Sequence, residues 1–196
     1  MSILERTKQE AAAQEIVEDK TARKFIGGIT FVLLTSLGAY VAIWFLNITP
    51  IPITLQPLFV ILAGAVLGPR AGALAMASYV LLGAAGAPVF AGGRAGYVWL
   101  FGPTGGYLLA YPAAAFVVGL LAGRSSSGLR LLGALTIGMA LIYLGGLSQL
   151  WLLTRQDLGT VVMQSVVPFL PGDLLKIGLA WLTVRSIRST SFGRLF

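Results

Sequence analysis

A carboxylate and an ammonium group, Asp173 and Lys176, are the residues best suited to chemistry, and they lie three positions apart near the end of the chain. If this segment is helical, the spacing places both side chains on one face of the helix. They could neutralise each other within the protein. They could instead bind a ligand that carries hydrogen-bond donors and an acidic group, because ionisable residues in strongly apolar surroundings often mark a functional site. Both interpretations remain open.

Arg94 lies in a glycine-rich stretch, 88–103, close to the aromatic residues Phe90 and Trp99. Its planar guanidinium group could clamp a ligand carboxylate, and the glycines would let the backbone fold closely around a small molecule. The same arginine could instead contact lipid headgroups within an aromatic belt. Gln56, in a proline-rich segment, could bind a ligand or be a loop amide whose hydrogen bonds are satisfied within the protein.

Three tyrosines, Tyr79, Tyr107 and Tyr111, lie within apolar segments of the chain. Tyrosines in such positions are more often packing residues than ligand contacts. Each hydroxyl nevertheless needs a hydrogen-bond partner in apolar surroundings. The residues alone therefore leave their role open.

Much of the common catalytic equipment is absent from the sequence, which contains no cysteine and no histidine. The chain therefore has no thiolate nucleophile, no imidazole base and none of the usual zinc or haem ligands, so we expect no metal site and no cofactor. It also lacks the glycine-rich phosphate loop of nucleotide-hydrolysing motors. Only the Asp173 and Lys176 pair and the tyrosines could support acid–base chemistry, which disfavours an enzyme.

The elements that position these residues must lie in a lipid bilayer. Of the 196 residues, 57% are hydrophobic and only 11% are charged, with a mean hydropathy of +0.86. A soluble domain is typically about 25% charged, and this chain cannot cover a globule with polar surface. The net charge of +7 comes from bases scattered between apolar runs, without a basic patch, so nucleic-acid binding is disfavoured.

Six apolar segments are candidate membrane-spanning helices, and several are short or interrupted by Gly and Pro. They cover residues 25–46, 55–67, 71–87, 104–123, 131–153 and 173–184. The fold class expected is an all-α integral membrane protein with six transmembrane helices. The membrane domain is expected to cover residues 25–187, between an N-terminal arm of residues 1–24 and a C-terminal tail of residues 188–196. We expect the arm to be a solvated cytoplasmic segment; the alternative is an amphipathic helix.

The distribution of positive charge sets the orientation of these six spans. Eleven of the 14 Lys and Arg residues fall on the side that holds both termini, two fall on the other side, and Lys176 lies within the last span. Positive charge concentrates in cytoplasmic loops, so both termini are expected in the cytoplasm. Gln56, Arg94 and Asp173 then fall in or beside three segments that face outward, 47–57, 88–106 and 154–173.

Several motifs together resemble a known transporter family. The run PIPITLQPLFVILAGAVLGPRAGALAMASYVLLGAAGAPVFAGG is followed by GPTGGYLLAYPAAA and, near the C-terminus, by PGDLLK. These elements resemble BioY, the biotin-specific substrate-binding (S) component of energy-coupling-factor (ECF) vitamin transporters. The resemblance covers about residues 27–187, and the combination of motifs is far more specific than any one of them. The N-terminal arm is longer than is typical of the family.

The resemblance implies a multi-pass protein of the prokaryotic cell (inner) membrane that binds biotin from outside. It would deliver the vitamin inward when coupled to a transmembrane T component and two ABC-type ATPases. Asp173 and Lys176 match the family's D-x-x-K ligand pair, Arg94 falls where the family places a basic contact, and Tyr79 lies in a region where a polar contact is expected. Gln56 or a tyrosine hydroxyl such as that of Tyr107 could donate to the ureido oxygen, and Phe90 and Trp99 could form apolar walls.

Two alternatives keep a membrane protein but change its role. An S component for a different vitamin would retain the fold and the coupling partners while changing the pocket. A structural membrane subunit would bind no small molecule. A panel of vitamin ligands separates these possibilities from biotin binding.

Overall fold

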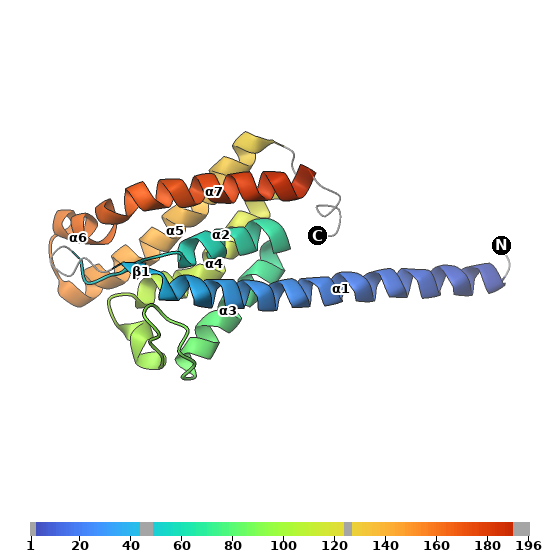
Figure 1. The fold of residues 1–196 in the computed structure, drawn as a ribbon, viewed down its shortest axis with the longest axis horizontal. Coiled ribbons are helices and arrows are strands. Elements are labelled where there is room, and N and C mark those ends of the chain that lie inside the picture. Colours follow the sequence, from blue (N-terminus) through green and yellow to red (C-terminus); the bar gives the residue numbers. More distant parts are fainter. Residues whose placement is uncertain (1–2, 44–48, 124–126, 190–196) are drawn as a thin grey trace.

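The chain is built almost entirely of helices (Figure 1), and the computed structural model describes residues 3–43, 49–123 and 127–189, with side chains from residue 20 onward. The long helices are α1 (Ile3–Tyr40), α2 (Gln56–Leu67), α3 (Pro69–Ala84), α4 (Gly105–Ala122), α5 (Gly128–Thr154) and α7 (Leu170–Ser189). Shorter elements are α6 (Leu158–Ser165) and the 3-10 helices η1 (Tyr97–Phe101) and η2 (Val167–Phe169). Strands β1 (Ala42–Ile43) and β2 (Ile53–Thr54) pair antiparallel, with Ala42 opposite Thr54.

Each of the six predicted spans overlaps one of the long helices, although the ends of the helices differ from the ends of the predicted spans. The first span was expected to reach residue 46, but α1 ends at Tyr40, and residues 44–46 of that prediction lie outside the described residues. At the other end, α1 begins at Ile3 and has no break at residue 24, where we expect the arm to end. The backbone of the described part of the arm is therefore helical and continuous with the first span.

Four helical segments of the described chain are long and apolar enough to cross a membrane: Lys20–Tyr40, Gly105–Ala122, Gly128–Thr154 and Leu158–Ser189. The other two predicted spans correspond to α2 and α3, which have 12 and 16 residues. At 1.5 Å per residue they reach about 18 and 24 Å, less than the roughly 30 Å of hydrocarbon in a bilayer. Both helices fall where the sequence analysis predicts short spans, but neither is among the four segments long enough to cross a membrane.

The break between α2 and α3 follows directly from the pair Gly68 and Pro69. Gly68 has a φ of 83°, a left-handed conformation that a residue with a Cβ rarely adopts. Pro69 then begins α3, where its lack of an N–H group leaves no helical hydrogen bond unmade. One long apolar run is thereby divided into two short helices.

The centre of the bundle is α4, which packs against α2, α3 and α5. Its contacts are close because small residues face one another at the crossings. A Cβ on Gly64 would lie 2.3 Å from the carbonyl oxygen of Ala115, and one on Gly106 would lie 2.1 Å from that of Gly145. Helices in lipid associate by such close backbone approach, because no hydrophobic effect draws them together there.

The exterior of the bundle is strongly apolar. Side chains such as Phe25, Leu37, Leu74 and Leu174 are 65–70% exposed. The helical exterior is therefore suited to hydrocarbon rather than water. Figure 1 also shows that α1 begins and α7 ends on the same side of the molecule, with the N-terminal part of α1 extending past the other helices, while α6 and the β1 strand lie on the opposite side.

Candidate functional site

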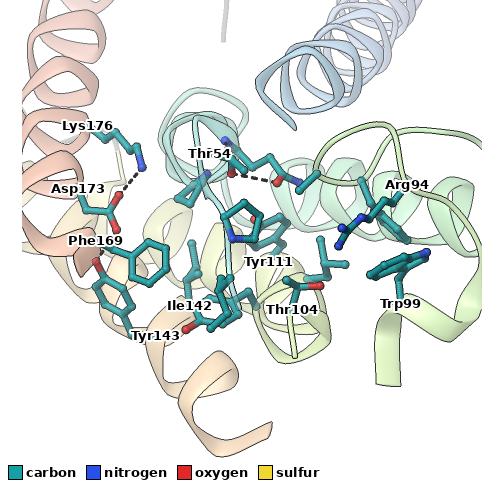
Figure 2. A pocket seen from close by; sticks show the side chains of 18 residues that line it. Thr54, Arg94, Trp99, Thr104, Tyr111, Ile142, Tyr143, Phe169, Asp173 and Lys176 are labelled. Carbon is teal, nitrogen blue, oxygen red and sulfur yellow. Dashed lines mark hydrogen bonds and ion pairs between the residues drawn. The ribbon is translucent and has the colours of Figure 1, made fainter. Parts of the chain in front are cut away.

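A pocket of about 640 Å³, including its mouth, lies on the side of the molecule where α6 and the β1 strand are found. Figure 2 shows its walls. The lining residues come from the segment before α2, the start of α2, the loop between α3 and α4, α4, α5, η2 and α7. They are Ile51, Pro52, Thr54, Gln56, Pro57, Phe90, Ala91, Arg94, Trp99, Thr104, Tyr107, Leu108, Tyr111, Ile142, Tyr143, Phe169, Asp173 and Lys176.

Asp173 and Lys176 lie one helical turn apart on α7 and are each 5% exposed. The Lys176 ammonium donates to Oδ1 of Asp173 at 2.5 Å. The Tyr143 hydroxyl, from α5, donates to Oδ2 of the same carboxylate. The two groups therefore neutralise each other within the protein, and both also line the pocket. Buried ion pairs are stable only when hydrogen bonds such as that of Tyr143 support them.

Gln56 is fixed at the start of α2 by hydrogen bonds on both ends of its amide. The Thr54 hydroxyl donates to Oε1 of Gln56 at 3.0 Å, and Nε2 of Gln56 donates to the Tyr79 hydroxyl at 2.5 Å. That hydroxyl donates in turn to the carbonyl oxygen of Val89 at 2.7 Å. Tyr79 does not line the pocket, unlike the other seven predicted residues. It positions Gln56 and the loop between α3 and α4 from behind.

Arg94, Phe90 and Trp99 come together at one end of the pocket because the loop between α3 and α4 turns tightly. The Phe90 amide donates to the carbonyl oxygen of Arg94 at 3.0 Å, and Gly92 and Gly93 between them have φ values of 71° and 76°. Only glycine adopts such angles freely. The turn leaves the Arg94 guanidinium over the Trp99 ring, 4.3 Å from its centroid, in a cation–π contact.

Tyr107 is held by its hydroxyl, which donates to the carbonyl oxygen of Ser165 at 2.6 Å. Its ring lies against Gly146, where a Cβ would come within 2.0 Å of a ring atom. The contact that Tyr107 offers the pocket is thus mainly aromatic. This differs from the expectation that its hydroxyl would reach a ligand.

Two further elements hold the pocket walls in place. The last residues of α1 bind both segments that line one side: Gly38 accepts from the Leu55 amide, and Ala39 accepts from the Gly92 amide, each at 3.1 Å. The Tyr40 hydroxyl donates to the Pro88 carbonyl oxygen at 2.7 Å. On the other side, Nε2 of Gln149, from α5, donates to the carbonyl oxygens of Leu100 and Gly102 at 2.9 and 2.7 Å. These bonds anchor η1, which carries Trp99.

Several lining residues escaped the sequence analysis. Tyr143 is the most important, and its only signal is a hydroxyl in the middle of an apolar span. Thr54 and Thr104 look like ordinary loop residues in the sequence. Ile51, Ile142 and Phe169 carry no signal, because an apolar wall residue has the same character as a packing residue.

The pocket combines a few charged side chains with apolar walls. Its charged lining residues are Arg94, Lys176 and Asp173, which give a formal net charge of +1. Among the described residues, no cluster of three metal-ligating side chains is present. The polar groups are distributed around apolar and aromatic walls, as in a site that orients a small molecule.

Comparison with known proteins finds a family profile and relatives that match most of the chain. The sequence profile of the BioY family matches residues 8–192. A probable biotin transporter BioY of Pyrococcus horikoshii is 43% identical over 150 residues, which cover 76% of this chain and 86% of the relative. The biotin transporter BioY of Thermotoga maritima is 38% identical over 172 residues, covering 88% of this chain and 99% of the relative.

A solved structure has the same fold. It is the crystal structure of the S-component for biotin from an ECF-type ABC transporter, with a TM-score of 0.82 and 24% sequence identity. The match covers 90% of this chain and 96% of that structure. The helical arrangement described above is therefore the fold of that crystal structure.

Proposed function

The chain belongs to the BioY family, and from this premise we propose that it is the substrate-binding component of a biotin uptake system. It binds biotin from the extracytoplasmic side and delivers it inward when coupled to a transmembrane T component and two ABC-type ATPases. The observation that carries this proposal is the pocket itself, which has apolar and aromatic walls and a formal net charge of +1. Biotin is a monoanion with a neutral polar head and an apolar bicycle, so the site complements it in charge and in polarity.

The arrangement of the lining residues supports one orientation of the vitamin. Lys176 and Asp173 form an ion pair at one end of the pocket, and the Arg94 guanidinium lies over Trp99 at the other end (Figure 2). The valerate carboxylate therefore pairs with Arg94, and the ureido N–H groups donate to the remaining lone pairs of Asp173. Gln56 borders the polar head, and Phe90 and Trp99 enclose apolar parts of the ligand.

The proposed topology has six membrane crossings with both termini in the cytoplasm of a prokaryotic cell, and the pocket opens to the outside. Its support is the concentration of Lys and Arg on the side of the termini and the common side on which α1 begins and α7 ends. The short helices α2 and α3 cross by locally thinning the bilayer or by leaving their ends in the polar interface.

Equilibrium binding of labelled biotin to the purified chain in detergent, without any partner, tests the proposal. Desthiobiotin, thiamine and riboflavin serve as competitors. We expect nanomolar binding that desthiobiotin alone displaces. A monodisperse protein that binds no biotin would contradict the proposal, and displacement by thiamine or riboflavin would identify an S component for another vitamin.

A further inference from the structure

Four tyrosines lie in or directly behind the pocket walls, and the hydroxyl groups of three of them donate hydrogen bonds within the protein. Tyr79 donates to a backbone carbonyl of the loop between α3 and α4. Tyr107 donates to a backbone carbonyl at the end of α6, and Tyr143 donates to Asp173. These three hydroxyls hold the walls of the site together.

Tyr111 differs from the other three. It lies on α4 one turn after Tyr107, lines the pocket and is only 3% exposed. Across residues 20–43, 49–123 and 127–189, its hydroxyl forms no hydrogen bond. In the same part of the chain, Ser165 Oγ is the only fully enclosed side-chain polar atom without a partner. The Tyr111 hydroxyl therefore retains access to the pocket volume.

The position of Tyr111 in the pocket limits which part of a bound ligand its hydroxyl can contact. Figure 2 shows it between Asp173 and Lys176 on one side and Arg94 and Trp99 on the other. The neighbouring amide of Gln56 already bonds Thr54 and Tyr79. A hydroxyl that faces the pocket without a partner in the protein can donate to an acceptor on a bound ligand, and it would lose a hydrogen bond if the ligand filled the pocket without supplying one.

We propose that the Tyr111 hydroxyl is a ligand-binding group that donates a hydrogen bond to the ureido oxygen of biotin. This inference rests on the proposed function and adds a specificity-determining residue to it. Asp173 accepts from the N–H side of the ureido group while Tyr111 donates to its oxygen. The site thereby forms hydrogen bonds with both the N–H donors and the oxygen acceptor of the ureido group.

The substitution Tyr111→Phe tests the assignment, because it removes the hydroxyl and keeps the ring. We expect its affinity for biotin to fall about tenfold, the usual effect of one hydrogen bond to a ligand. For an analogue whose ureido oxygen is replaced by sulfur, a weak acceptor, the loss should be below about threefold. Tyr97→Phe, at an exposed position of η1, makes the same chemical change outside the pocket and should leave both affinities unchanged.

Thermal unfolding of the ligand-free protein supplies a second, independent readout. Tyr111→Phe should unfold at the wild-type temperature or above it, because the hydroxyl has no partner to lose. Tyr107→Phe loses a satisfied bond to Ser165 and should unfold at a lower temperature. Comparing the two variants therefore distinguishes a hydroxyl without a hydrogen-bond partner in the protein from a hydrogen-bonded one on the same helix.

The outcomes are distinct for the two proposals. Nanomolar biotin binding by the wild type together with a change of less than twofold in Tyr111→Phe would overturn the Tyr111 assignment alone. An equal loss for biotin and its sulfur analogue, or a drop in unfolding temperature as large as that of Tyr107→Phe, would also overturn it. A wild-type chain that binds no biotin would overturn the proposed function and this assignment with it.

Discussion

The Asp173 carboxylate is the most constrained polar group of the pocket. Both of its oxygens accept hydrogen bonds from the protein, one from Lys176 and one from Tyr143. A carboxylate has about four lone-pair directions, so acceptor capacity remains for a ligand. Lys176 and Tyr143 thus fix the orientation of the Asp173 carboxylate in the pocket wall.

The substitution Asp173→Asn should weaken biotin binding by about a hundredfold or more. It removes a charged acceptor and leaves the Lys176 ammonium buried without its counterion, which is strongly unfavourable. Equilibrium binding in detergent measures the effect. The double variant Asp173→Asn/Lys176→Met removes the unpaired charge and should recover folding but not affinity; biotin binding by either variant within threefold of the wild type would refute the assignment.

At the scale of residues, the sequence predicts charged groups better than neutral ones. Arg94, Asp173 and Lys176 stand out because charge is rare in this chain, and all three line the pocket. Tyr79 was predicted as a contact but lies one hydrogen bond behind Gln56. Tyr143 was missed because its role depends on how α5 faces α7, and such tertiary contacts have no signature in a single sequence.

Among the elements, η1 depends on α5 for its position. The Gln149 side chain reaches the backbone carbonyls of Leu100 and Gly102, on either side of the end of η1. Trp99 belongs to the same 3-10 helix and supports the Arg94 guanidinium. The pocket wall that carries Arg94 is thus connected to α5 through hydrogen bonds from the Gln149 side chain to backbone carbonyls of η1 and the residue after it.

Replacing Gln149 by Leu keeps a side chain of similar size and removes both donors. We expect biotin to dissociate about tenfold faster from Gln149→Leu, with little change in the association rate, because η1 loses its anchor. Stopped-flow or filter-binding kinetics measure the two rates. Ser148→Ala, on the exposed face of the same helix, is the matched control, since the Ser148 hydroxyl bonds its own helix at Leu144. A dissociation rate like that of the control would refute this role.

The close crossing of α2 and α4 leads us to predict how substitutions of glycine change the unfolding temperature. In Gly64→Ala the new methyl group would lie 2.3 Å from the carbonyl oxygen of Ala115, so the two helices must move apart. We expect a drop of several degrees in the unfolding temperature measured in detergent. Gly133→Ala on α5, where nothing lies within 4 Å, should be neutral or stabilising. Equal unfolding temperatures for the two variants would contradict the packing described.

The sequence predicts the location of every long helix but not all of their ends. Runs of apolar residues define the spans, and the Gly68–Pro69 pair marks the break between α2 and α3. The helical extension of α1 to Ile3 escaped prediction because its polar residues resemble a solvated arm. The elements α6 and η1 are too short for hydrophobic periodicity to reveal them.

Considered as a whole, the molecule separates its charges along the membrane normal of the proposed topology. Between residues 20 and 189 the only carboxylates are Asp157 and Asp173, and both lie on the proposed outer side. Asp157 caps α6, and hydrogen bonds from Thr160 hold the pKa of its carboxyl below the ordinary value. On the proposed cytoplasmic side, Arg130 and Arg188 donate to backbone carbonyls near the end of α4. Cations at a helix C-terminus stabilise it.

The absence of cysteine makes this topology directly testable. A single cysteine at Ser127, in the turn before α5, should react with a membrane-impermeant maleimide only after cells are permeabilised. One at Gln156, an exposed residue between α5 and α6, should react in intact cells, because the proposed topology places that loop outside. The reverse labelling pattern would invert the orientation, and equal labelling of both sites in intact cells would exclude an odd number of crossings between them.

The hydrogen bonds at the end of α1 give that helix a mechanical property. With 38 residues it is a continuous rod of about 57 Å. Three consecutive residues at one tip, Gly38, Ala39 and Tyr40, are tied to the two segments that form one side of the pocket. The rod therefore acts as a lever: force applied to its opposite end tilts it, and a tilt must either carry those two segments along or break their bonds. As long as these bonds hold, any tilt of α1 displaces that side of the pocket wall with it.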